Sequence, residues 1–143
     1  MMEALKKKAG EEAAKRIQSG QKIGLGTGST VRYFLEALGE RLSKGELSHI
    51  VGVPTSKNTE KLALSLNIPL TTLEVEPSLD LCVDGADEVD PQLDLIKGLG
   101  GALLREKIVA MASQYFIVIV DNGKLVSQLG DQCPVPVEVL PFG

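Results

Sequence analysis

The sequence reads Val-Asp-Gly-Ala-Asp-Glu from Val83 to Glu88, directly after an apolar run that begins at Leu79. This pattern predicts a buried strand that ends in two carboxylates on a glycine-containing turn. The lysine Lys97 and the glycine-rich loop Gly98–Gly101 follow, and a helical pattern then begins with Glu106 in its first turns. A purely structural segment rarely combines carboxylates, an ammonium group and a loop of free N–H groups. We therefore expect the functional site to be built around this segment.

Strands and helices alternate along the rest of the chain. Leu5, Ala9, Ala13 and Ile17 recur every four residues, which indicates an amphipathic helix that ends near Gly20. Residues 115–120 are apolar throughout, so we expect this strand to be buried on both faces. The predicted strands are 22–26, 50–53, 70–73, 79–83, 115–120 and 135–140, and the other helices are 31–42, one that follows an N-cap at Ser56, and 102–113.

This alternation is typical of an α/β protein, and 143 residues are about the length of one domain. We predict a Rossmann-like, open, mostly parallel sheet with helices on both faces and right-handed crossover connections. In such sheets the ligand lies beyond the carboxyl ends of the strands. Three segments follow strands directly and should therefore converge on one edge of the sheet: 27–30, 84–87 and 121–124.

Composition excludes several classes of function. A net charge of −4, an aromatic content of 3% and the absence of tryptophan argue against a nucleic acid partner, which usually needs a basic face and stacking side chains. No apolar stretch is long enough to span a membrane, and residues 1–20 lack the apolar region of a signal peptide. Two cysteines make no disulfide framework, and Cys82 is expected to be a small buried residue. We expect a cytoplasmic protein, although a mature organellar protein would share these features.

The segment from Gly26 to Thr30 reads Gly-Thr-Gly-Ser-Thr and joins a predicted strand to a helix. Free N–H groups and the helix dipole attract an anion at such a junction, and three hydroxyl groups add donors. The alternative is a tight turn with Ser29 or Thr30 as an ordinary N-cap, which would not need this many glycines. The segment is neither a Walker A motif nor a good dinucleotide fingerprint, because it lacks Gly-Lys-Ser/Thr and has Ser29 where glycine or alanine should pack. We favour a phosphate site.

The acidic turn allows other interpretations when it is taken alone. Asp84, Asp87 and Glu88 could hold a hard cation, although no histidine or cysteine accompanies them. The only histidine, His49, precedes a different strand and is expected at the surface. A simpler alternative is that one aspartate caps a turn and that Lys97 is a solvated surface lysine.

Three motifs in this order, Gly-Thr-Gly-Ser-Thr, Asp-Gly-Ala-Asp-Glu and Lys-Gly-x-Gly-Gly-Ala-x-x-x-Glu-Lys, resemble those of the type A ribose-5-phosphate isomerase family. The resemblance runs from the first helix to Gly143. It implies interconversion of D-ribose 5-phosphate and D-ribulose 5-phosphate in the non-oxidative pentose phosphate pathway, with no metal or organic cofactor. It implies catalytic roles for Glu106, Asp84, Asp87 and Lys97. It implies substrate contacts for Thr27, Gly28, Ser29, Thr30, Asp84, Gly85, Ala86, Asp87, Lys97, Gly98, Leu99, Gly100, Lys124 and Lys6.

The chemistry of the implied reaction explains why these groups would be needed. A proton moves between C2 and C1 of the sugar through a cis-enediolate, which a sheltered carboxylate base such as Glu106 can achieve. The developing oxyanion needs fixed donors, which Lys97 and the N–H groups of Gly98–Gly101 would supply. Asp84 and Asp87 would move protons among the sugar oxygens and help to open the ring.

The chain departs from the family pattern in two ways. Leu99 stands where many members have glycine; because leucine tolerates positive φ poorly, we expect an ordinary backbone conformation and an N–H that is free for a ligand. Family members also continue into a smaller α/β lid or assembly domain. Residues 1–143 are therefore expected to form a catalytic α/β domain, truncated at its C-terminal end, of a protein that is a homodimer or homotetramer at full length.

Two rival functions remain open from the sequence. One is a sugar-phosphate sensor domain of the DeoR type, which needs no catalytic base; the joint presence of Glu106 and Lys97 favours the enzyme. The other is an α/β enzyme that uses a dinucleotide or coenzyme A.

Overall fold

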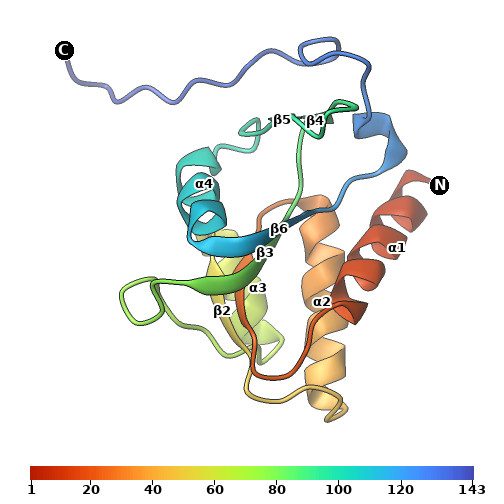
Figure 1. Cartoon of the computed structure of the whole chain (residues 1–143), viewed down its shortest axis with the longest axis vertical. Coiled ribbons are helices and arrows are strands. Elements are labelled where there is room, and N and C mark those ends of the chain that lie inside the picture. Colours follow the sequence, from red (N-terminus) through yellow and green to blue (C-terminus); the bar gives the residue numbers. More distant parts are fainter.

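A parallel sheet forms the centre of the computed structural model, which describes residues 1–143 (Figure 1). It contains β1 (Lys22–Leu25), β2 (Val51–Pro54), β3 (Leu79–Asp84) and β6 (Ser113–Val118). The strand order is β2-β1-β3-β6, and every pairing is parallel. The predicted α/β class with a mostly parallel sheet is confirmed.

Helices cover both faces of this sheet, as predicted. α1 (Met2–Lys15), α2 (Ser29–Ser43) and α3 (Lys57–Ser65) contribute to one core. α4 (Leu103–Met111) lies on the opposite face, where its Val109 packs with the fully buried Cys82 of β3. Apolar residues alternate along β1, so Ile23 and Leu25 join the core of the first three helices.

Two glycines in and after β1 permit close packing. A Cβ on Gly24 would lie 2.6 Å from the Val109 side chain, so only glycine lets α4 approach the sheet this closely. A Cβ on Gly26 would lie 2.6 Å from the Cα of Asp84. The loop after β1 therefore lies directly against the carboxyl end of β3, which brings two of the predicted site segments together.

A small hairpin and a short 3₁₀ helix lie beyond the carboxyl ends of the strands (Figure 1). β4 (Glu88–Val89) and β5 (Leu95–Ile96) pair antiparallel, with Glu88 opposite Ile96. The 3₁₀ helix η1 (Asn122–Lys124) follows β6, and Val89 forms a parallel bridge with Leu125 just after it. Strands of two residues carry no readable alternation, so the hairpin was not predicted.

Two of the predicted strands are wrong. Residues 70–73 are reduced to one bridge between Leu70 and Gly52, on the outer side of β2, before the chain turns away. Residues 135–140 form no strand; Pro136 within the segment and Pro134 just before it have no backbone N–H to donate to a ladder.

Other details also differ from the predictions. β6 is an edge strand, and Tyr115 is 71% exposed, so the prediction that this strand is buried on both faces is wrong. An apolar run shows that a strand can be buried, but it does not reveal whether a neighbouring element covers it. α1 ends at Lys15, before Gly20, whereas His49 is exposed as predicted. No helix has both the length and the apolar character that crossing a membrane requires.

Candidate active site

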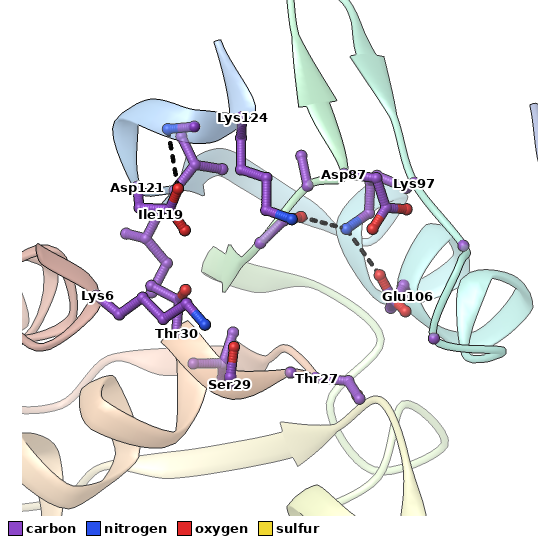
Figure 2. A pocket seen from close by; sticks show the side chains of 18 of the residues that line it. Lys6, Thr27, Ser29, Thr30, Asp87, Lys97, Glu106, Ile119, Asp121 and Lys124 are labelled. Atoms are coloured by element: carbon purple, nitrogen blue, oxygen red, sulfur yellow. Dashed lines mark hydrogen bonds and ion pairs between the residues drawn. The ribbon is translucent and has the colours of Figure 1, made fainter. Parts of the chain in front are cut away.

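A cavity of about 340 Å³ opens at the carboxyl ends of β1, β3 and β6 (Figure 2). The segments that follow these three strands line it, so the predicted convergence on one edge of the sheet is observed. Asp84 lies beneath the cavity, with 1% of its side chain exposed, and Leu99 is 54% exposed outside it. The predicted residues that line the cavity are Lys6, Thr27, Gly28, Ser29, Thr30, Gly85, Ala86, Asp87, Lys97, Gly98, Gly100, Glu106 and Lys124.

Lys97 is the centre of a buried charge cluster. Its Nζ lies 2.7 Å from Glu106 Oε1 and 3.3 Å from Asp84 Oδ2, and it donates to the carbonyl oxygen of Gly85 at 2.5 Å. Only 12% of the lysine side chain and 8% of the Glu106 side chain are exposed. The alternative of a solvated surface lysine is therefore wrong. Glu106 enters the cluster from the first turn of α4, which begins just after the glycine-rich loop (Figure 2).

Asp84 is the last residue of β3 and binds the backbone of two segments that line the cavity. Its Oδ1 accepts the N–H of Thr27 at 3.1 Å and that of Gly85 at 2.7 Å. Its Oδ2 is buried and has no hydrogen-bond partner, although Lys97 lies close to it. Burial raises the pKa of Asp84 to about 6; the Lys97 ammonium opposes this rise, and the Glu106 carboxylate adds to it. Asp84 can therefore exchange a proton near neutral pH.

Asp87 holds the glycine-rich loop. Its Oδ2 accepts the N–H of Leu99 at 3.0 Å, while its own N–H donates to Ile96 of β5 at 2.7 Å. Leu99 has no positive φ, as predicted, but its N–H is already bonded and is not free for a ligand. The positive φ values of this loop fall on Gly98 (107°) and Gly101 (78°), where glycine is needed.

The loop after β1 presents an open helix N-terminus to the cavity. Gly28, with φ of 122°, is the N-cap of α2, and no side chain caps the helix. The N-cap alternative for Ser29 and Thr30 is therefore wrong. The N–H groups of the first helical turn, from Ser29 to Val31, have no acceptor within the helix, and all three residues line the cavity. These N–H groups have the geometry of an anion-binding site.

One of the three hydroxyl groups predicted for this loop is used elsewhere. Thr27 Oγ1 lies 2.7 Å from Thr55 Oγ1 and 2.9 Å from Ser56 Oγ, in a hydroxyl cluster at the start of α3. Thr59, in the same cluster, donates to the carbonyl oxygen of Gly26 at 2.7 Å. The Thr27 side chain therefore anchors the loop to α3, and Ser29 and Thr30 are the hydroxyl groups left for a ligand.

Two further lysines, carried by different elements, line the cavity. Lys6 belongs to α1 and Lys124 to η1, and both line the cavity. Figure 2 shows the Lys6 side chain reaching towards Ser29 and Thr30, whereas the Lys124 side chain extends towards Lys97. Glu3 Oε1 lies 3.2 Å from Lys6 Nζ and helps to orient it. The cavity is thus lined by three lysines and by the Glu106 carboxylate.

The segment after β6 contributes more residues than the sequence predictions included. Asp121 is 4% exposed and accepts the N–H of Gly123 at 2.9 Å, which shapes the turn that carries Lys124. The position of Asp121 directly after a strand was the available signal. The apolar residues Met2, Val31, Ile119 and Val120 also line the cavity, and their residue types gave no such signal.

The hard-cation alternative finds no support in the geometry. Glu88 is turned away from the two aspartates and accepts N–H groups from residues 130–133. No group of three or more His, Cys, Asp or Glu side chains is arranged to hold a metal ion.

The fold and the cavity place the chain among α/β proteins that hold a small ligand beyond the carboxyl ends of a parallel sheet. A family model described as ribose 5-phosphate isomerase A (phosphoriboisomerase A) matches residues 51–143. The chain belongs to this family.

Individual relatives agree with the family match. Ribose-5-phosphate isomerase A of Deinococcus radiodurans is 53% identical over 142 residues, which cover 99% of this chain and 62% of that protein. A probable ribose-5-phosphate isomerase 3, chloroplastic, of Arabidopsis thaliana is 55% identical over 139 residues, covering 96% of this chain and 50% of the relative. A solved D-ribose-5-phosphate isomerase in complex with phospho-erythronic acid has a TM-score of 0.92 and 51% identity, covering 94% of this chain and 58% of that one. The chain thus spans about half to three fifths of these relatives.

Proposed function

We propose that this chain carries the active site of an aldose–ketose isomerase that interconverts D-ribose 5-phosphate and D-ribulose 5-phosphate. The observation that carries the proposal is the buried Lys97–Glu106 pair, 2.7 Å apart, in the same cavity as the uncapped N-terminus of α2. One end of the cavity suits a phosphate, and the other suits proton transfer at carbon. Membership of the family supports this assignment.

Glu106 is proposed as the general base. It removes the proton from C2 of the open-chain aldose and returns it to C1, so that one carboxylate serves both carbons of the cis-enediolate. Its position at 6% exposure keeps bulk water away from the transferred proton. Lys97 stabilises the negative charge that develops on the sugar oxygens, together with N–H groups of the glycine-rich loop that remain free.

Asp84 and Asp87 have different proposed roles. Asp84 has its pKa raised to about 6 by burial, so it can give and take a proton while the ring opens. Asp87 holds the glycine-rich loop through the N–H of Leu99 and presents the rest of its carboxylate to the cavity. Neither role requires a metal or an organic cofactor.

The phosphate is proposed to bind at the N-terminus of α2. The free N–H groups of the first helical turn, the hydroxyl groups of Ser29 and Thr30, and the ammonium groups of Lys6 and Lys124 would surround it. The relative solved with phospho-erythronic acid holds a phosphorylated ligand, which supports a phosphate subsite in the family. This arrangement would orient the chain of the sugar towards Glu106.

The sensor and dinucleotide alternatives explain less of the site. A binding module would not need a carboxylate buried against a lysine, because desolvating such a pair is costly without a chemical use. A dinucleotide would need a larger cavity than this one, whose volume is about 340 Å³.

Residues 1–143 are proposed to be the catalytic α/β domain of the protein, acting on a small sugar phosphate within a homodimer or homotetramer. We further propose a cytoplasmic or organellar location, since one relative is named as chloroplastic.

The direct experiment is a coupled assay for ribulose 5-phosphate formation by this 143-residue chain. Saturation-transfer NMR with NAD and coenzyme A, run on the same sample, addresses the dinucleotide alternative. Turnover of ribose 5-phosphate, without saturation transfer from either nucleotide, is the expected result. Binding of ribose 5-phosphate without turnover would favour the sensor instead.

A further inference from the structure

The carboxylate of Glu88 is fully buried and bonded to a distant turn. Its Oε1 accepts the N–H of Gly130 at 2.7 Å, and its Oε2 accepts those of Gln132 at 2.7 Å and Cys133 at 2.9 Å. Both oxygens are therefore used, and all three donors come from residues more than 40 positions away in the chain. Gly130 adopts a positive φ of 90°, which lets the turn wrap around the carboxylate.

The charge state of Glu88 fits this bonding. Burial opposes its ionisation, but the N–H groups of Gln132, Gly130 and Cys133 outweigh burial and hold the pKa of the carboxyl below its ordinary value. A carboxylate that accepts three N–H groups is difficult to replace, because an amide of the same shape would offer a donor where an acceptor is needed.

Glu88 stands between two parts of the cavity wall. On one side it follows Asp87 and pairs with Ile96, the residue before Lys97. On the other side, Val89 accepts the N–H of Val126 at 2.9 Å and forms a bridge with Leu125, the residue after Lys124. The turn that Glu88 holds continues this second segment, so the segment is bonded to the hairpin at two points.

We propose that Glu88 is a positioning residue, whose carboxylate fixes the segment after β6 to the β4–β5 hairpin and so sets the position of Lys124 in the cavity. This proposal depends on the function proposed above in one respect: it assumes that Lys124 contacts the phosphate. The chain would use the last residue of its acidic motif to align the two sides of the site, while Asp87 lines the cavity and Asp84 lies beneath it.

The test is Glu88→Gln, with Glu138→Gln as a matched control, because Glu138 lies exposed in the C-terminal segment. We expect the amides of Gly130, Gln132 and Cys133 to exchange faster in Glu88→Gln, and the amide signals of Gly123 and Lys124 to move although Glu88 does not contact them. Binding of ribose 5-phosphate, measured by calorimetry, should weaken about tenfold, as expected when a charge-assisted contact is lost. The control should match the parent chain in all three measurements.

A double-mutant cycle separates positioning from a general loss of structure. If Glu88 acts through Lys124, Glu88→Gln adds nothing to the weaker binding of Lys124→Met, whereas independent effects multiply. Multiplied effects, or unmoved signals of Gly123 and Lys124, would overturn the proposal. Where Glu88→Gln does not fold, Glu88→Asp keeps the charge and should show a smaller change in the same direction. Moved signals in a chain that does not bind ribose 5-phosphate would support the positioning role and reject the proposed function.

Discussion

The single residues of the site are distinguished by burial and by their partners. Lys97 lies between two carboxylates, of which Glu106 lines the cavity and Asp84 lies beneath it. The two acids therefore have different environments, and different environments assign different roles to the same functional group. An amide substitution at each position separates these roles.

Glu106→Gln should abolish proton transfer and leave binding intact. The change removes the basic oxygen but preserves the volume, and loss of a general base typically lowers the rate by about 10²–10⁴. The loss should fall on kcat rather than KM, because the proposed phosphate contacts lie in other segments. In deuterated water the parent chain should introduce deuterium at C1 or C2 of the sugar phosphate, and Glu106→Gln should not. Exchange at the parental rate would make Asp84 or Asp87 the next candidates for the base.

Asp84 should make stability depend on pH. Its pKa rises from 3.8 to about 6 on folding, so its contribution is fully present well below pH 3.8 and is lost as the pH rises through 6. Relative to Asp84→Asn, the parent chain should lose roughly 2 kcal/mol of unfolding free energy between pH 4 and pH 7. Urea unfolding of both proteins at pH 4 and pH 7 measures the difference. A constant difference would show that Asp84 stays ionised in the folded chain.

At the scale of elements, the N-terminus of α2 is the feature that selects an anion. Ser29→Asp would place a fixed negative charge among the free N–H groups, where it would compete with a phosphate for the same donors. We expect KM for ribose 5-phosphate to rise by at least about tenfold, with a smaller change in kcat. Ser65→Asp adds the same charge at an exposed position near the end of α3 and should leave KM unchanged. An unaltered KM in Ser29→Asp would remove the phosphate from this loop.

The elements that could be predicted from the sequence are those with a long pattern. The helix periodicities and the apolar runs of β1, β2 and β3 predicted the α/β class and the convergence of three loops. The β4–β5 hairpin was missed because two-residue strands have no periodicity. Residues 135–140 alternate like a strand, but Pro136 cannot donate to a ladder.

The residues of the site could be predicted from the sequence, but the hydrogen bonds among them could not. Glycines, hydroxyl groups and carboxylates after strands were sufficient to indicate which segments meet. The sequence could not show that Thr27 bonds to the start of α3, or that Asp87 occupies the N–H of Leu99. These contacts depend on the relative placement of segments that are distant in the chain, which local patterns do not encode.

At the scale of the whole molecule, the chain exposes large apolar side chains on β6 and in its C-terminal segment. Tyr115 is 71% exposed, and Val137, Leu140 and Phe142 are exposed by 77%, 79% and 96%. Such surface favours association, so sedimentation of the 143-residue chain should show species that grow with concentration. Tyr115→Lys should reduce this growth more than Leu64→Lys, which changes a residue of 58% exposure on α3. A chain that sediments as a monomer at all concentrations would contradict this expectation.

The oxygen atoms around Lys97 have a consequence for how a sugar would bind. Its ammonium group has three N–H bonds, and three oxygen atoms, from Gly85, Asp84 and Glu106, lie around it. Because Asp84 Oδ2 accepts no hydrogen bond from it, a sugar oxygen that reaches Lys97 would compete with Gly85 and Glu106 for the ammonium group. When a sugar oxygen replaces Glu106 beside Lys97, the carboxylate would lose the ammonium partner that lies 2.7 Å away. In the proposed reaction, the arriving sugar would thus separate the Glu106 carboxylate from Lys97 when a carbon-bound proton is within its reach.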